Sequence, residues 1–233
     1  MTRDPDNLSG VLVIDKGPGF TSHDVVAIVK RLARARKVGH LGTLDPAASG
    51  VLPLVINEAT MHASKLAGGE KVYEFTLSLG RSTDTDDDTG RTIAEAPVPA
   101  EIMSGLVGLL PRFVGRTMQV PPAYSAVKRA GVRSYRMARE GRALPLDPRP
   151  AEIRSLELVG GCMPEPRLRM ACGPGTFVRA LCRDLGAALG CGGHAKGIRR
   201  LASGPYIIDM AVTLEALKAE PNALRDHIVP VAL

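Results

Sequence analysis

The clearest alternation of apolar and polar positions lies between residues 71 and 80. Its apolar members are two residues apart, which places them on one face of an extended strand: Tyr73, Phe75, Leu77 and Leu79. Short uninterrupted apolar runs are typical of buried strands. These patterns predict further strands at 10–15, 51–56, 153–159 and 168–172.

Apolar residues that recur every three to four positions predict helices between these strands. The first helix is expected to be capped by Ser22 and to end in a basic segment that contains Arg31, Arg34, Arg36 and Lys37. A longer helix is predicted from 176 to 189, where its apolar stripe ends before Gly190. Shorter helices are expected at 58–66, 99–110, 134–141 and 213–219. Because strands and helices interleave without a regular β-α-β period, the pattern predicts an α+β fold with a mixed central sheet.

The composition is that of an ordinary globular protein, with 233 residues, 45% of them apolar and 23% charged. The longest apolar run, Val51–Ile56, is far shorter than the ~18 residues that a membrane span needs. The apolar run Val11–Ile14 is too short for the core of a signal peptide. These observations predict a cytoplasmic protein without a membrane partner.

Positive charge is concentrated in one part of the chain. The net charge is +6, and residues 128–154 hold eight basic against three acidic residues, a local excess of +5. Such a stretch attracts a polyanion, because neutralised phosphates release counterions. A solvated arginine-rich surface is the alternative. With only four Tyr, four Phe and no Trp, any nucleic acid would be bound mainly through arginine, lysine and backbone groups.

Two sets of residues could bind a metal, and neither fits well. Asp84, Asp86 and Asp88 have the spacing of a calcium loop, but Thr89 occupies the position that requires glycine. A solvated acidic turn is therefore favoured there. The four cysteines form no Cys-x-x-Cys pair, and reduced structural thiols are expected: Cys162, Cys172, Cys182 and Cys191. The sequence predicts no metal and no cofactor.

The richest candidate for chemistry is the segment Lys37–Pro53. It presents His40 and Asp45 among three glycines, so that a ligand can approach the backbone closely and meet a single carboxylate. From spacing alone Asp45, which precedes Pro46, could equally begin an ordinary turn.

This segment resembles the catalytic motif of bacterial tRNA pseudouridine-55 synthases. Four further stretches, in the same order, resemble other parts of that family: Gly10–Ser22, the acidic turn Leu79–Gly90, Gln119–Lys128 with Arg139–Gly141, and Gly175–Arg179 with Leu185–His194 and Arg199–Gly204. Two departures are visible. The proline of the first motif is shifted by one place to Pro18, and Phe177 stands where the family usually has tyrosine.

The resemblance implies a pseudouridine-synthase-type catalytic domain at 10–233, after a flexible N-terminus at 1–9. An RNA-clasping insertion is expected at about 119–152. The chain ends about where many relatives begin a C-terminal RNA-binding domain, so that domain is expected to be absent. The implied reaction converts uridine at position 55 of the tRNA T-loop to pseudouridine by cleaving the N1–C1′ bond, turning the base and joining C5 to C1′. The implied partner is the T-arm of tRNA, bound by a monomer.

The same resemblance assigns roles to individual residues. Asp45 acts at the ribose, as nucleophile or as base. Arg179 is expected to pair with Asp45, and Tyr73 to lie over the uracil ring. His40 would fill the space that the flipped nucleotide leaves. The remaining implied contacts are with the pocket and the RNA phosphates, through Lys16, Phe177, Ile198, Lys128, Arg129 and Arg133.

Two other functions remain in view at this stage. A non-catalytic tRNA-binding protein that assists folding would use the same basic surface, but a buried carboxylate such as Asp45 would repel phosphates. A nucleoside-cleaving hydrolase would need a second, water-activating carboxylate, which no motif supplies.

Overall fold

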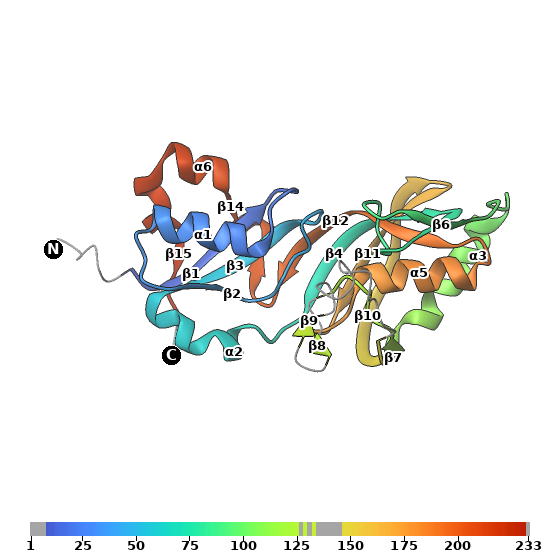
Figure 1. Ribbon diagram of the computed structural model, residues 1–233, viewed down its shortest axis with the longest axis horizontal. Helices are drawn as coiled ribbons and strands as arrows, with labels where there is room; N and C mark the ends of the chain where they lie inside the picture. The colour runs from blue at the N-terminus through green and yellow to red at the C-terminus, as the bar shows by residue number, and fades with distance from the viewer. Residues whose placement is uncertain (1–7, 126–127, 130–131, 134–145, 232–233) are drawn as a thin grey trace. The chain divides into compact units, whose positions relative to one another are not determined.

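The computed structural model describes residues 8–125, 128–129, 132–133 and 146–231. The helix predicted at 134–141 and the side chains of Lys128, Arg129 and Arg133 lie outside this description. The chain divides into two compact units (Figure 1). Unit 1 comprises Met1–Val72 and Arg199–Leu233, and unit 2 comprises Tyr73–Ile198.

Unit 1 is built on a mixed sheet. Its central pair is the antiparallel β1 (Gly10–Lys16) and β3 (Ser49–Ile56), as the two apolar runs predicted. A parallel strand lies on each side of this pair, β14 (Val212–Thr213) on β1 and the end of β12 (Gly193–Ser203) on β3. Short antiparallel strands complete the sheet: β2 (Val38–His40), β13 (Tyr206–Ile207) and β15 (Ile228–Val229).

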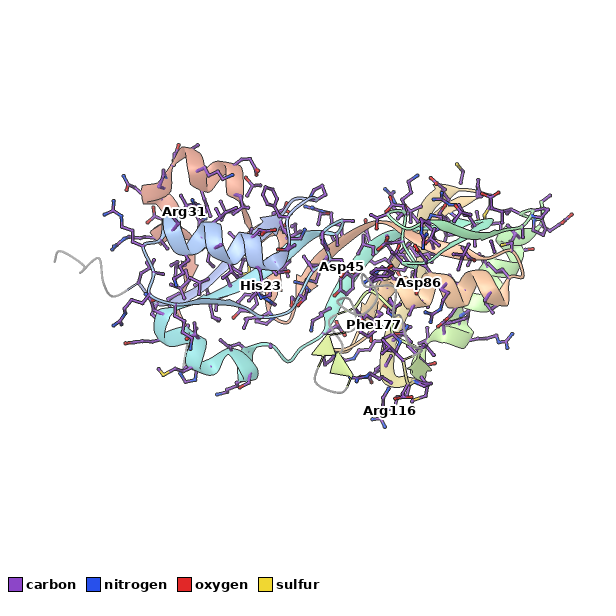
Figure 2. The ribbon with its side chains drawn as sticks, in the orientation of Figure 1. His23, Arg31, Asp45, Asp86, Arg116 and Phe177 are labelled. Atoms are coloured by element: carbon purple, nitrogen blue, oxygen red, sulfur yellow. The ribbon has the colours of Figure 1, made fainter. Side chains whose placement is uncertain are left out.

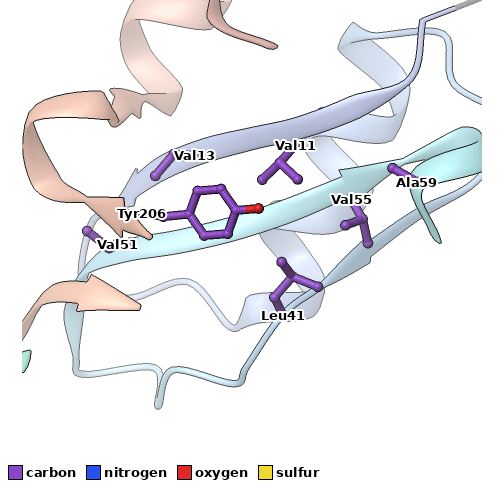
Figure 3. Packing of buried hydrophobic residues seen from close by; sticks show 7 residues of the cluster. All are labelled: Val11, Val13, Leu41, Val51, Val55, Ala59 and Tyr206. Atoms are coloured by element: carbon purple, nitrogen blue, oxygen red, sulfur yellow. The ribbon is translucent and has the colours of Figure 1, made fainter. Parts of the chain in front are cut away.

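Both faces of this sheet are covered. In one core cluster, alternate side chains of β1 (Val11 and Val13) and of β3 (Val51 and Val55) pack with Leu41, Ala59 and Tyr206 from three other segments (Figure 3). The intervening residues of β1, Leu12 and Ile14, are also fully buried. Burial on both faces explains why these strands are continuous apolar runs and do not alternate.

Two helices of unit 1 begin at side-chain caps. Helix α1 (Ser22–Leu32) is capped by Thr21, whose hydroxyl accepts a bond from the Asp24 N–H in a capping box. The prediction that Ser22 caps this helix is therefore wrong by one residue, because Ser22 has another partner that is described below. Thr213 caps α6 (Leu214–Ala219). The helix predicted at 58–66 is a 3₁₀ turn, η2 (Asn57–His62), followed by the short α2 (Ala63–Leu66).

Unit 2 contains a second run of strands in the order β4, β11, β10, β7. Strand β4 (Lys71–Leu79) buries every second side chain, as its alternation predicted. The strands that follow it in this order are β11 (Glu165–Cys172), β10 (Arg149–Cys162) and β7 (Gly115–Gln119). Among its described residues, unit 2 also contains two ribbons, a 3₁₀ turn and two helices: β5 (Arg81–Thr83) with β6 (Thr92–Glu95), β8 (Lys128–Arg129) with β9 (Val132–Arg133), η3 (Leu110–Phe113), α3 (Ile102–Leu109) and α5 (Val178–Ala188).

The longest element that the sequence did not predict is β12, which enters unit 1 from unit 2. It alternates poorly, and Gly197 interrupts it with a positive φ of 58°. Across the described residues, no helix combines the length and the apolarity that a membrane crossing requires.

One close approach in unit 1 can be tested through glycine. Gly50 has φ +99°, and a Cβ there would overlap the carbonyl oxygen of Arg200 and lie 2.8 Å from its nitrogen. Gly19 has a similar φ of +89° with no atom within 4 Å of such a Cβ. Gly19→Ala should therefore cost only the backbone strain of about 1–2 kcal/mol. Gly50→Ala should lower the free energy of unfolding by at least ~2 kcal/mol more, because β3 and β12 must separate. Urea titrations of both variants measure this difference, and equal losses would contradict it.

Candidate active site

The loop that carries Asp45 is held by its own backbone. Leu41 donates its N–H to the Pro53 carbonyl at 2.9 Å, which closes the loop against β3. The Asp45 carbonyl accepts the Ala48 N–H at 3.1 Å and so forms a turn directly after the carboxylate. The side chain of Asp45 is half-buried. The segment therefore enters and leaves Asp45 in a fixed conformation.

Arg200 holds the first part of this loop. Its side chain is almost fully buried, and its guanidinium donates to three carbonyl oxygens. These belong to Val51 at 2.7 Å, Gly42 at 3.1 Å and Thr43 at 3.4 Å. A planar guanidinium can satisfy several acceptors in fixed directions, so Arg200 fixes the loop against β3.

Ser22 holds the middle of the loop. Its hydroxyl accepts the N–H of Leu44 at 2.9 Å and donates to the carbonyl of the same residue at 3.1 Å. Both bonds are buried. The first residue of α1 thus anchors the residue that precedes Asp45, which is why Thr21 acts as the cap.

Lys16 holds the last part of the loop. Its ammonium group is buried and donates to the carbonyls of Gly17 at 2.9 Å, Phe20 at 2.9 Å and Pro46 at 3.3 Å. Burial lowers the pKa of Lys16 from 10.5 to about 8, although the nearby Asp45 carboxylate raises it; Arg200 lowers it further. With these bonds, every carbonyl from Gly42 to Pro46 has a donor.

His40 lies at the end of β2, just before this loop. Its Nδ1 accepts the N–H of Gly42 at 3.4 Å. The ring of His23, on the first turn of α1, meets the His40 ring edge-on, with centroids 5.4 Å apart and planes at 77° (His23 and Asp45 are labelled in Figure 2). His40 is thus braced from two sides. The predicted RNA contact of His40 stays a prediction.

Unit 2 presents a different cluster, centred on the first turns of α5. Arg179 is buried and donates at 2.9 Å to the carbonyls of Thr85 and Tyr124, and its guanidinium lies 3.6 Å from the Asp87 carboxylate. Its neighbour Arg183 forms an ion pair with Asp86 at 2.9 Å. Arg179 therefore connects the acidic turn to the start of the predicted insertion. Its predicted pairing with Asp45 stays a prediction.

The acidic turn is not the solvated turn that the sequence favoured. Asp87 is buried, and its carboxylate accepts bonds from the hydroxyls of Thr85 and Thr89 and from the Thr89 N–H. Burial raises the pKa of Asp86, while Arg183 and then Arg179 oppose the shift. Two of the carboxylates that suggested calcium thus bind arginines, since Asp84 pairs with Arg91 at 3.2 Å and Asp86 with Arg183.

The same helix also holds the segment that leads into the insertion. The Gln119 amide bonds the backbone of Phe177 twice, accepting its N–H at 3.0 Å and donating to its carbonyl at 3.4 Å. Arg183 donates to the Val120 carbonyl at 2.9 Å. Phe177 is the N-cap residue of α5 and is half-buried (Figure 2). These bonds fix the base of the predicted RNA-clasping insertion.

The two remaining predicted pocket residues lie on strands. Tyr73 is on the buried face of β4, with 8% of its surface exposed. Ile198 is half-buried in β12. The structure therefore brings Lys16, His40 and Asp45 together in unit 1, and places Tyr73, Phe177, Arg179 and Ile198 in unit 2.

Comparison with known families decides the identity of this arrangement. The model of the TruB family pseudouridylate synthase N-terminal domain matches residues 30–178, and that of the tRNA pseudouridylate synthase B C-terminal domain matches 179–232. The chain belongs to the TruB family of pseudouridylate synthases. This confirms the family that the motifs predicted.

Curated relatives agree along nearly the whole chain. The tRNA pseudouridine synthase B of Solibacter usitatus is 46% identical and is matched over 96% of this chain and 77% of its own length. That of Xanthomonas campestris is 43% identical and is matched over 97% of this chain and 74% of its own length. That of Rhodopseudomonas palustris is 44% identical over 98% of this chain, which spans 64% of that relative. The chain is thus shorter than each of these relatives.

Solved structures support the fold. A Cbf5-Nop10-Gar1 complex contains a chain that is 29% identical, with a TM-score of 0.74 over 98% of this chain and 62% of that one. A chain of an H/ACA RNP bound to a substrate RNA containing 2′-deoxyuridine is 26% identical. Its TM-score is 0.72, over 97% of this chain and 60% of that one. The predicted α+β fold of pseudouridine-synthase type is confirmed.

Several residues that build the site were missed by the sequence analysis. Arg200 was seen only as part of a motif, because a buried arginine that binds carbonyls leaves no local pattern. Ser22 was taken for a cap, and Asp87 was overlooked between the acidic residues of the turn. The ion pair between Asp86 and Arg183 could not be seen in the sequence, because 97 residues separate the two. Only the structure brings such residues together.

The pKa of Lys16 leads to a test of its burial. Because folding lowers that pKa, the unfolded chain keeps the Lys16 proton between pH 8 and 10.5 while the folded chain loses it. Wild type should therefore gain free energy of unfolding relative to Lys16→Met, by roughly 1 kcal/mol per pH unit in this window. The exposed Lys65 serves as control: for Lys65→Met the difference from wild type should be constant. Urea titrations across the window measure both, and a constant or falling difference for Lys16→Met would exclude the lowered pKa.

Proposed function

We propose that this chain converts uridine at position 55 in the T-loop of tRNA to pseudouridine. The observation that carries the proposal is Asp45, a single half-buried carboxylate on a loop whose carbonyls, Gly42 to Pro46, all have donors. The family to which the chain belongs and its tRNA pseudouridine synthase B relatives support the same activity.

The reaction needs an ionised carboxylate at the ribose. The N1–C1′ bond of uridine breaks, the uracil turns, and C5 forms a new bond to C1′; C5 then loses its proton and N1 ends with one, so atoms balance without a redox partner. Attack on C1′ and removal of a ribose proton both require the charged form of Asp45. The buried cation of Lys16 interacts electrostatically with the Asp45 carboxylate.

The other residues take the roles that the family resemblance assigns. Arg179 provides a second cation for Asp45, and its bonds to Thr85 and Tyr124 keep its guanidinium oriented. Tyr73 lies over the uracil ring, and His40 replaces the flipped nucleotide in the RNA stack. The remaining contacts line the pocket or bind phosphates, through Lys16, Phe177, Ile198, Lys128, Arg129 and Arg133.

We extend the proposal to the protein's setting. It acts in the cytoplasm as a monomer on the T-arm of tRNA, without metal or cofactor, through one catalytic domain at 10–233. The insertion at about 119–152 clasps the RNA. Assay of the purified chain in the presence of a chelator tests whether it needs a metal, and its mass measured in solution tests whether it is a monomer.

The carboxylate itself gives the first prediction. Asp45→Asn should reduce turnover at saturating tRNA by at least ~10³-fold, while tRNA affinity changes by less than ~1 kcal/mol, because only the chemical step uses the charge. Asp209→Asn removes an exposed carboxylate and should leave both unchanged. Site-resolved mapping of pseudouridine in unmodified tRNA and a binding titration measure the two effects. Turnover of Asp45→Asn within tenfold of wild type would refute the assignment, and unchanged turnover would favour a non-catalytic tRNA-binding protein.

The loop anchor gives a second prediction. Ser22→Ala leaves the buried N–H and carbonyl of Leu44 without partners, and should cost about 2–3 kcal/mol of stability and at least ~10-fold in kcat. Thr21→Ala, at the adjacent position, removes only the helix cap and should cost ~1 kcal/mol with little change in kcat. Thermal unfolding and single-turnover rates of the pair separate loss of stability from loss of positioning. A similar kcat for both variants would show that the loop does not depend on Ser22.

A further inference from the structure

Five cations are crowded between the end of α1 and the start of β2. Residues 30–37 hold Lys30, Arg31, Arg34, Arg36 and Lys37 without one acidic residue. We call these five residues the basic cluster. All five side chains are exposed. Within the described part of the chain none of their five side chains takes part in an ion pair or a hydrogen bond, whereas other arginines, such as Arg91, Arg169 and Arg199, are paired with carboxylates.

The helix itself does not account for this cluster. Lys30 and Arg31 lie in the last turn of α1, where cations interact favourably with the helix dipole. Arg34, Arg36 and Lys37 lie beyond the helix end, where this effect has faded. Five like charges within eight residues repel one another, and salt screens only the part of this repulsion that acts beyond the ~8 Å Debye length. A polyanion would relieve that repulsion.

The position of the cluster relative to Asp45 is fixed within unit 1. The N-terminal end of α1 holds the Asp45 loop through Ser22, and Arg31 lies toward its other end (Figure 2). Eleven helical residues span about 16 Å. From Lys37, β2 returns to His40 within three residues. A double-stranded RNA stem of roughly six base pairs covers the same length, because A-form RNA rises less per pair than the ~3.4 Å of B-form DNA.

We propose that the basic cluster binds the phosphates of the double-stranded stem that adjoins the target uridine. It would be a second phosphate-binding surface, on unit 1, in addition to the basic stretch at 128–154. This inference rests on the proposed function. An anionic membrane fits less well, because the segment exposes no large apolar side chain that could insert: Leu32 is half-buried and Ala35 is buried.

The stem length provides the test. Two hairpins with the same T-loop are used, one with about three base pairs and one with about eight, so that only the longer spans the ~16 Å. The cluster variant combines Arg31→Gln, Arg34→Gln and Arg36→Gln. A control variant with the same loss of charge combines Arg112→Gln, Arg116→Gln and Arg167→Gln, which are exposed residues of unit 2. Circular dichroism and thermal unfolding confirm that both variants fold.

For the long hairpin, the cluster variant should bind at least ~10-fold more weakly at low salt. Its plot of log K against log salt should be flatter by roughly 2 to 3 units, which corresponds to three lost duplex phosphate contacts. The affinity of the cluster variant for the short hairpin should fall by less than ~2-fold, and the control variant should bind both hairpins like wild type.

Three results would overturn the proposal: unchanged binding of the long hairpin, equal weakening for both hairpins, or an equal effect of the control variant. The last would indicate only the general field of the protein. Binding to phosphatidylglycerol vesicles is measured in parallel. If the cluster variant loses vesicle binding but binds RNA like wild type, the cluster is assigned to a membrane. Pseudouridine mapping on both hairpins with wild type is scored separately. Length-dependent binding without product would refute the proposed function and leave the RNA contact standing.

Discussion

The candidate site depends on how its loop carbonyls are satisfied. A loop at the edge of a core cannot leave polar backbone groups buried without partners, since each would cost about 1–3 kcal/mol. Here the donors come from side chains, with Arg200 on the first carbonyls, Ser22 on Leu44 and Lys16 on Pro46. Two of these donors are buried cations, which require electron-rich neighbours. The loop and its donors therefore stabilise each other, and the carboxylate of Asp45 lies in the field of the charge that holds its backbone.

In unit 2, two arginines near the start of helix α5 also need compensating partners. Cations near a helix N-terminus are unfavourable unless they are compensated. Arg179 and Arg183 are compensated by Asp87 and Asp86 and by carbonyls of the segment 120–124. One helix turn thereby fixes both the acidic turn and the base of the predicted insertion. Both arginines are structural links, and Arg179 is also a candidate for the chemistry.

Local patterns predicted the parts of the molecule that depend on local sequence. The alternation in β4, the apolar run of β3 and the stripe of α5 were all recovered, because burial alone determines them. The glycine-rich loop drew attention to Asp45, but only the resemblance gave it a role, since a lone carboxylate before a proline is equally typical of an ordinary turn. Arg200 and β12 could not be predicted at all. Their roles depend on pairing with residues about 150 positions away, such as Gly50 and Val51, and that pairing arises only when the chain folds.

The bonds of Lys16 have a consequence for local motion. An ammonium group has three donors, and all three are directed to carbonyls, two in the turn after β1 and one in the Asp45 loop. Gly19 adds a backbone bond to the same Pro46 carbonyl. Neither segment can open to solvent without breaking the bonds of the other. In hydrogen exchange the amides of the two segments would therefore share one cooperative opening event, although 30 residues separate Lys16 from Pro46 in sequence.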